Sequence, residues 1–218
     1  MSVNIGKVES IDQKGKMVQT GIFKNRIDSP VTITRLGIAG DEQADLVNHG
    51  GVEQAVCAYP FEHYPFWEKK LGKSLDCSAF GENLTLIGLT EDEVRIGDTL
   101  QWGTAVLQVS QPRKPCFKIG LKHGEPQMAL WVKETGYSGF YLRVLTEGVA
   151  QSSDPIQYIE RMAHNPSVTD VNQASYSNDT ALETLGRMAQ VPELSRNWRR
   201  SFEKKAGKAM SRRKMNKE

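Results

Sequence analysis

The chain has 218 residues, of which 39% are hydrophobic and 25% are charged, and its formal net charge at pH 7 is +2. These proportions are typical of a soluble globular protein that is long enough for one large domain, or for one domain with a small appendage. No apolar run approaches the roughly 18 residues of a membrane-spanning helix, so no membrane partner is expected.

The N-terminal residues and the cysteines bear on the compartment. The N-terminus lacks the basic and apolar segments of a secretory signal peptide. The three cysteines are an odd number and include no Cys-x-x-Cys pair, which argues against a disulfide framework. The expected location is therefore the cytoplasm.

The net charge hides an asymmetry along the chain. Residues 196–218 contain ten Lys or Arg and two acidic residues, a net of +8, so the rest of the chain carries −6. Such a tail can bind nucleic acid or another anionic partner. A solvated helix with a basic end explains it more simply, and we favour that interpretation.

The first part of the chain predicts strands over residues 3–11, 17–27 and 31–36, because their side chains alternate between apolar and polar. Within the second strand, Thr20, Lys24 and Arg26 share one face. Two cations and a hydroxyl suit an anionic ligand, although an exposed strand face produces the same pattern and is the simpler reading of it.

A glycine-punctuated acidic loop follows over residues 36–45 and includes Asp41. It leads to Asn48, His49, Gly50 and Gly51. Paired glycines after a histidine let backbone N–H groups approach a ligand closely, as in oxyanion and phosphate sites. Ordinary turns use the same pair, so both interpretations stay open.

The middle of the chain predicts one helix and many short strands. A helix is expected from Tyr64 until Gly72 ends it, with its aromatic stripe packed and His63 exposed. Further strands are expected over residues 55–59, 84–86, 94–98, 99–103, 105–111, 140–145 and 156–159, with a helix over 126–135. This density of strands favours a barrel or sandwich.

The stretch Pro112-Arg113-Lys114-Pro115-Cys116 ends the predicted strand 105–111 and presents one thiol. A thiol next to two cations ionises more easily, and a thiolate is both a nucleophile and a soft metal ligand. Burial of the two charges would be costly, so we expect Cys116 to be accessible and to carry the chemistry. The alternative is a small buried residue, the role expected of Cys57, whereas Cys77 belongs to a loop.

After about residue 164 glycine becomes rare and three helices are predicted. Ser167 or Thr169 caps the first, Asp179 caps a second over residues 180–189, and Pro192 opens the third. We therefore divide the chain into domains 1–163 and 164–218. A three-helix unit with a basic last helix also resembles a helix-turn-helix module, so DNA binding is an alternative role.

Several motifs in this order resemble the MOSC-domain family, named after the C-terminal domain of the molybdenum cofactor sulfurase, in its bacterial YiiM-like branch. The matching stretches are residues 20–24, 40–44, 49–51, 80–84, 97–98 and 109–116. The resemblance covers nearly the whole chain. It implies a mainly β fold with α-helices: a MOSC-type β-barrel with flanking helices, plus a small C-terminal three-helix appendage.

The resemblance also implies an activity, which is reduction of N-hydroxylated compounds, such as N-hydroxylated purine bases, by a molybdenum enzyme. The cofactor would be the molybdenum cofactor in its molybdopterin form, with Cys116 as the metal ligand. A separate flavoprotein reductase would supply electrons. The expected cofactor-binding residues are Thr20, Lys24, Arg26, Asn48, His49, Gly50, Gly51, Asn83, Arg113 and Cys116, and His49 or Asp41 could relay a proton.

Three alternatives remain. A cysteine presented in this way would also suit a sulfur carrier or transferase that works through a Cys116 persulfide. The basic tail could dock an acidic flavoprotein, or the C-terminal helices could bind DNA. A homodimer is compatible with all of these.

Overall fold

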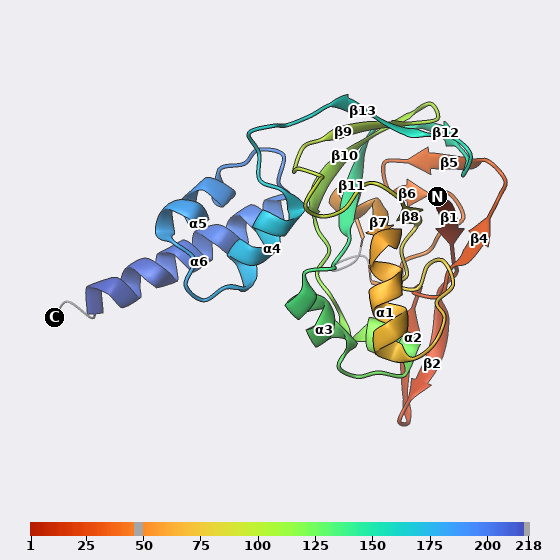
Figure 1. Cartoon of the computed structure of the whole chain (residues 1–218), viewed down its shortest axis with the longest axis horizontal. Helices are drawn as coiled ribbons and strands as arrows, with labels where there is room; N and C mark the ends of the chain where they lie inside the picture. Colours follow the sequence, from red (N-terminus) through yellow and green to blue (C-terminus); the bar gives the residue numbers. More distant parts are fainter. Residues whose placement is uncertain (46–49, 216–218) are drawn as a thin grey trace.

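The computed structural model describes residues 1–45 and 50–215. It shows a curled sheet with short helices at its side, and a group of three helices that carries the C-terminus away from the sheet (Figure 1). The strands are β1 (Ser2–Ile5), β2 (Glu9–Gln13), β3 (Lys16–Thr20), β4 (Asn25–Ile27), β5 (Val31–Thr34), β6 (Gly37–Ile38), β7 (Val56–Pro60), β8 (Leu84–Leu86), β9 (Thr99–Trp102), β10 (Ala105–Pro112), β11 (Phe140–Thr146), β12 (Gly148–Ala150) and β13 (Ile156–Glu160). The helices are η1 (Val52–Gln54), η2 (Phe61–His63), α1 (Tyr64–Leu71), α2 (Phe117–His123), α3 (Met128–Thr135), α4 (Val168–Tyr176), α5 (Leu182–Ala189) and α6 (Arg196–Met215).

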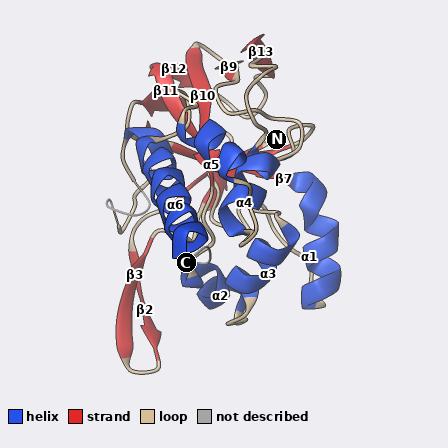
Figure 2. Ribbon diagram, turned by 90° about the vertical axis from the view of Figure 1, so that its left-hand side faces the viewer, coloured by secondary structure: helices blue, strands red, loops and turns tan. Residues whose placement is uncertain are grey.

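The largest sheet has eight strands in the order β13-β9-β10-β11-β7-β8-β1-β4. All neighbours are antiparallel except β7 and β8, which are parallel. The sheet curls into a half-barrel, and a smaller sheet, β12-β5-β6, lies beside it. The β2–β3 hairpin projects from the body of the molecule (Figure 2). These features confirm the predicted mainly β, barrel-like fold with flanking helices.

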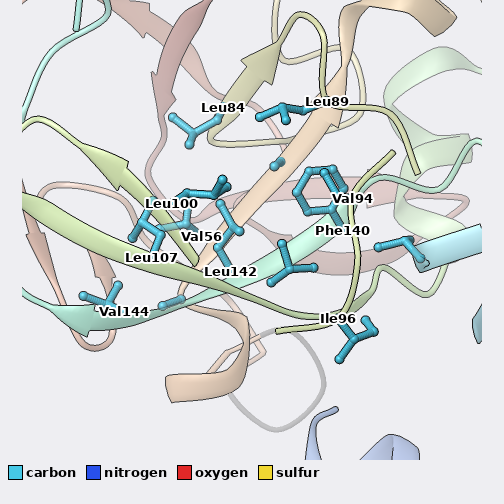
Figure 3. Packing of buried hydrophobic residues seen from close by; sticks show 14 of the residues in the cluster. Val56, Leu84, Leu89, Val94, Ile96, Leu100, Leu107, Phe140, Leu142 and Val144 are labelled. Atoms are coloured by element: carbon cyan, nitrogen blue, oxygen red, sulfur yellow. The ribbon is translucent and has the colours of Figure 1, made fainter. Parts of the chain in front are cut away.

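The core lies inside the curl of the sheet, where aliphatic side chains from facing strands pack together (Figure 3). Val56, Leu100, Leu107 and Leu142 are fully buried there. A second apolar cluster, which includes Trp67, Phe80 and Ile119, lies under the short helices α1 to α3. The site described below lies beside this second cluster.

The three C-terminal helices share the core of the sheet. Leu194, Trp198 and Phe202 are buried in the same apolar cluster as the strands, and the Ser195 N–H donates to the Ser110 carbonyl of β10 at 3.0 Å. The three-helix appendage is thus present as predicted. Within the part of the chain that the structure describes, no helix combines the length and apolar character needed to cross a lipid bilayer.

Close backbone approaches interrupt the first two predicted strands. A Cβ atom at Gly6 would lie 2.3 Å from the Phe23 carbonyl oxygen, and one at Gly21 would lie 2.3 Å from that of Glu42. The predicted strand 3–11 therefore splits into β1 and β2, and the predicted strand 17–27 splits into β3 and β4. The expected single face of Thr20, Lys24 and Arg26 does not exist.

Other predictions were wrong in detail. Residues 94–98 form turns and one isolated bridge between Arg95 and Ser167 instead of a strand. His63 is 8% exposed instead of exposed, because it bonds to Glu91 and stacks on Tyr137. The helix α2 was not predicted.

Two of the three C-terminal helix starts also differ from the prediction. Ser167 caps α4 as expected, but α5 begins at Leu182 because the Asp179 amide and the Thr180 hydroxyl bond back to the preceding turn. The helix α6 begins at Arg196 instead of near Pro192, since the chain first makes a turn closed by the Leu194 N–H and the Val191 carbonyl.

Candidate active site

A hollow of about 550 Å³, including the open solvent at its mouth, lies where β3, β7, β11, α2 and the segment after β10 meet the loop before residue 46. Five of the predicted cofactor-binding residues line it: Thr20, Lys24, Asn83, Arg113 and Cys116. Asp41, the predicted proton relay, lines it too. The other residues that line it are Gly21, Ile22, Glu42, Gln43, Ala44, Asp45, Cys57, Gly81, Lys118 and Tyr141.

The Asp41 carboxylate is the centre of the polar contacts in this hollow. It pairs with the Lys24 ammonium and accepts the Gly6 N–H at 2.9 Å. Its other oxygen accepts the Asn83 side-chain N–H at 2.9 Å. Both oxygens are thus engaged, and the carboxylate fixes two predicted cofactor-binding side chains in place.

Asn83 ties this centre to the sheet. Its side-chain oxygen accepts the Cys57 N–H at 3.1 Å, and its side-chain N–H also donates to the Asn4 carbonyl at 3.3 Å. The neighbouring Glu82, which the sequence analysis missed, is fully buried and accepts from the Tyr64 hydroxyl, the Phe80 N–H and the Thr85 hydroxyl. The hydrogen bonds of Glu82 therefore fix the segment 80–84, which positions Asn83 at the hollow.

Arg113 is 7% exposed, although two charges before Cys116 were expected to resist burial. Its guanidinium donates from Nη2 to the Phe80 carbonyl at 2.6 Å, while Nη1 is buried without a hydrogen-bond partner among residues 1–45 and 50–215. Burial by itself lowers the pKa of Arg113, but the neighbouring Cys57, Tyr141 and Cys116 more than offset this effect. The net result is a pKa above the ordinary value, so the guanidinium stays charged. Lys114 points elsewhere, over the Trp198 ring at 4.8 Å.

Cys116 is half-buried and immediately precedes α2. The chain there is extended, with φ −126° and ψ 161°, so the helix begins only after the thiol has reached the hollow. Lys118, in the first turn of α2, lines the same hollow and was missed. Lys118 lies two residues after Cys116 in the sequence, which could have indicated that it belongs to the site. Because α2 was not predicted, the sequence did not indicate towards which side its side chain points.

A second thiol lines the hollow. Cys57 is buried in β7, as predicted for a core residue, yet it also faces the same space as Cys116. Burial raises the pKa of the Cys57 thiol to about 11. Cys57 is therefore a neutral thiol near pH 7, so it is a poor nucleophile and a poor metal ligand.

Arg26, Gly50 and Gly51 are not among the described residues that line the hollow. Arg26 lies on the surface, where it pairs with Asp28 at 3.0 Å. Gly50 and Gly51 precede η1 and do not belong to the described lining. Asn48 and His49 lie outside the described residues.

Lys122 holds the segments around the hollow together from outside it. Its ammonium donates to the Ile22 carbonyl at 3.0 Å and to the Ser78 carbonyl at 2.6 Å. Burial lowers the pKa of Lys122 to about 8. This lysine joins α2 to two loops that frame the site, a role that no sequence pattern indicated.

Comparisons with known proteins agree with this architecture. The MOSC domain model matches residues 45–157, and the YiiM-like 3-alpha helix domain model matches residues 166–205. The Bacillus subtilis protein YflK is 46% identical over 94% of this chain and 93% of its own length. A Gibberella moniliformis protein named a reductase is 33% identical over 88% of this chain, which corresponds to 35% of that longer protein.

One of the solved structures that this chain resembles is YiiM from Geobacillus stearothermophilus. It superposes with a TM-score of 0.81 at 38% identity and covers 94% of this chain and 97% of its own. The MOSC domain model covers most of the half-barrel and the cysteine before α2, and the 3-alpha model covers the three helices that follow. The chain therefore belongs to the MOSC-domain family, in its YiiM-like branch.

Proposed function

We propose that this chain binds the molybdenum cofactor in its molybdopterin form and reduces N-hydroxylated compounds, such as N-hydroxylated purine bases, to amines. Membership of the MOSC-domain family and the relative named a reductase support an oxidoreductase activity. One observation carries the finer proposal: the half-buried thiol of Cys116 and the buried guanidinium side chain of Arg113 line one hollow.

The residues present fit this cofactor. A thiolate is a suitable ligand for a soft metal site, and Cys116 would hold the metal. Molybdopterin carries a phosphate, which charge-assisted donors bind well. Arg113 and Lys118 each bring a cation to the lining of the hollow, and within the described residues Arg113 Nη1 has no hydrogen-bond partner. Lys24 contributes less charge, because Asp41 already balances it.

When bound, the cofactor would supply the two-electron chemistry that the side chains of the hollow cannot perform. Reduction of an N-hydroxylated amine consumes two electrons and two protons and releases the amine and water. The chain's own residues orient the cofactor and the substrate. Asp41 acts here as a positioning residue, since its oxygens already accept from Lys24, Gly6 and Asn83. His49 stays our candidate for the proton donor.

An activity assay tests the proposal. The protein is purified from a host that makes the cofactor, mixed with an N-hydroxylated purine and a reduced viologen dye, and the amine is measured by chromatography. Wild type should form the amine, Cys116→Ser should not, and Cys77→Ser, a thiol outside the hollow, should behave as wild type. Wild-type protein that carries the cofactor and forms no amine would overturn the proposal.

The same preparations separate this activity from sulfur transfer. A sulfur carrier would hold cyanide-releasable sulfur on Cys116 and pass it to an acceptor without any molybdenum present. We expect no such sulfur on the wild-type protein. Its presence, together with an absence of reductase activity, would favour the sulfur-transfer alternative.

A further inference from the structure

The last helix, α6, carries a row of exposed cations that the residues of the Cys116 hollow do not use. Arg196, Arg200, Lys204 and Lys208 follow one another at intervals of four residues, and all four are exposed. Side chains at this spacing lie on one side of a helix, with a rise of about 6 Å from each to the next. We call these four residues the basic stripe. Because α6 runs away from the sheet (Figure 1), the stripe extends along a projecting element.

The charges of the basic stripe lack compensation within residues 1–45 and 50–215. None of its four side chains forms an ion pair with a carboxylate of this described part of the chain. Glu203 is the only acidic residue of the α6 sequence, and it is exposed as well. Like charges four residues apart on a helix repel one another. The row therefore weakens the helix unless a partner brings negative charge to it.

Two other cations of α6 attach the helix to the body of the protein. The Lys205 ammonium donates to the carbonyls of Ala174 and Ser175 at the end of α4, at 2.7 Å and 2.8 Å. Arg199 Nε donates to the Leu194 carbonyl at 3.0 Å. Cations that hold the helix in place are thus distinct from those of the basic stripe, which remain available to a partner.

The helix α6 begins close to the Cys116 hollow. The Ser195 N–H donates to the Ser110 carbonyl of β10, and β10 leads directly into the segment that ends at Cys116. In that segment the exposed Lys114 places its ammonium 4.8 Å from the centroid of the Trp198 ring of α6. A protein bound along the start of the basic stripe is therefore close to the hollow.

The reaction proposed above needs a supply of electrons. Each turnover consumes two electrons, and repeated turnover draws them from an external donor. Electron transfer between proteins weakens steeply with distance, so a protein donor has to bind close to the hollow. Complementary charge on the two surfaces brings such partners together quickly and sets their orientation.

We propose that the basic stripe is the docking surface of an acidic electron-transfer protein that supplies the Cys116 hollow. This inference rests on the function proposed above. A small acidic protein suits the stripe better than nucleic acid does, because residues 1–195 carry a net charge of −6. The stripe spans only about 18 Å of helix. A long polyanion would extend past it and meet the net negative charge of the rest of the chain.

Binding of oxidised flavodoxin, a small acidic redox protein, to the full-length chain tests the surface without any turnover. Fluorescence anisotropy of labelled flavodoxin should show saturable binding that weakens as the ionic strength rises. Lys204→Glu/Lys208→Glu should weaken binding about tenfold, because each substitution replaces an attraction by a repulsion. The matched control is Lys16→Glu/Lys69→Glu, which changes the net charge equally at exposed positions of β3 and α1 and should keep the wild-type affinity.

Three results would overturn the docking surface: no binding of flavodoxin, binding that does not depend on salt, or equal losses in the two double variants. Duplex DNA tests the other class of partner. DNA that binds more tightly than flavodoxin, and loses its affinity in Lys204→Glu/Lys208→Glu, would assign the stripe to nucleic acid instead.

Turnover separates this surface from the proposed function. Each fully reduced flavodoxin gives one electron, so two of them and two protons convert one N-hydroxylated purine into the amine and water. Lys204→Glu/Lys208→Glu should raise the KM for flavodoxin about tenfold. With reduced viologen, a small donor that needs no docking surface, kcat should equal that of wild type.

The two proposals fail in different ways. Flavodoxin binding with the expected variant pattern, but no amine from either donor, would refute the proposed function and leave the docking surface in place. Amine formation with viologen, together with a flavodoxin KM that is unchanged in Lys204→Glu/Lys208→Glu, would refute the docking surface alone.

Discussion

Lys24 and Asp41 form an ion pair whose side chains are only 5% and 4% exposed. Removing one partner of such a pair leaves a buried charge without compensation, which typically costs about 3–5 kcal/mol. Asp41→Asn should therefore lower the free energy of unfolding by about this amount, measured by urea denaturation. It should also loosen Asn83, which shares the carboxylate.

The surface pair of Arg26 and Asp28 is the matched control. Its side chains are 57% and 75% exposed, and exposed pairs contribute at most about 1 kcal/mol. Asp28→Asn should therefore have little effect on the free energy of unfolding. Equal losses in Asp28→Asn and Asp41→Asn would show that the Lys24–Asp41 pair is not buried as described.

Lys122 gives the stability of the protein a specific dependence on pH. Its pKa falls from an ordinary value of 10.5 to about 8 on folding, because of burial. Between these values the unfolded chain binds more protons at this group than the folded chain. Stability from this residue is therefore lowest below pH 8 and rises as the pH increases towards 10.5.

The variant Lys122→Met isolates this contribution. The difference in free energy of unfolding, wild type minus variant, should increase from about pH 8 to about pH 10. Urea titrations at several pH values measure it. A difference that stays constant or decreases over this window would contradict a lowered pKa at Lys122.

Individual residues of the site could be predicted where they belong to a recognisable sequence motif. Cys116, Lys24 and Asn83 follow from their motifs, and all three reach one hollow. The burial of Arg113 could not be predicted, because it depends on the Phe80 carbonyl, thirty-three residues away in the chain. Cys57 was assigned to the core correctly, but its second role needs β11 beside β7, which is tertiary information.

Among the helices, α4 offers the clearest test of a local rule. The Ser167 hydroxyl accepts the Asp170 N–H, and the Asp170 carboxylate accepts the Ser167 N–H, a complete capping box. Ser167→Ala should lower the free energy of unfolding by about 1 kcal/mol. Asp179→Ala should leave it nearly unchanged, since α5 has Ala181 at its N-cap; a larger loss from Asp179→Ala than from Ser167→Ala would reverse this assignment.

Elements defined by local chemistry were predicted well. Gly72 and Gly136 end α1 and α3 in left-handed conformations, as their positions after apolar runs indicated. Elements that end because of contacts with distant parts of the chain were not predicted well. The breaks after β1 and β3 come from close contacts of Gly6 and Gly21 with the backbone of other segments. The short helix α2 has no apolar stripe or capping side chain that would indicate it.

At the scale of the whole molecule, the sheet and the three C-terminal helices share the larger of the two apolar clusters. Side chains of α4, α5 and α6 belong to the same cluster as those of β7, β9, β10 and β11. We therefore expect the sheet and the three helices to unfold together in a single transition, with equal calorimetric and van't Hoff enthalpies. Two separate heat-absorption peaks would mean that the helices fold independently.

At the scale of the whole molecule, the residue patterns predicted the fold class better than the order of the strands in the sheet. The density of short strands indicated a barrel or sandwich, but strand order depends on pairings such as β11 with β7 that are far apart in the chain. The resemblance to the MOSC-domain family supplied the arrangement. The attachment of the basic α6 through Trp198 and Phe202 was not foreseen.

The molybdenum content of the purified protein tests the central claim most directly. Wild type, Cys116→Ser and Cys77→Ser are produced in the same cofactor-competent host, and metal and extractable pterin are measured per chain. Wild type and Cys77→Ser should each contain molybdenum and pterin, whereas Cys116→Ser should lose the metal, because its thiolate ligand is gone. Wild-type protein without molybdenum, or equal molybdenum in Cys116→Ser, would contradict the assignment of Cys116 as the metal ligand.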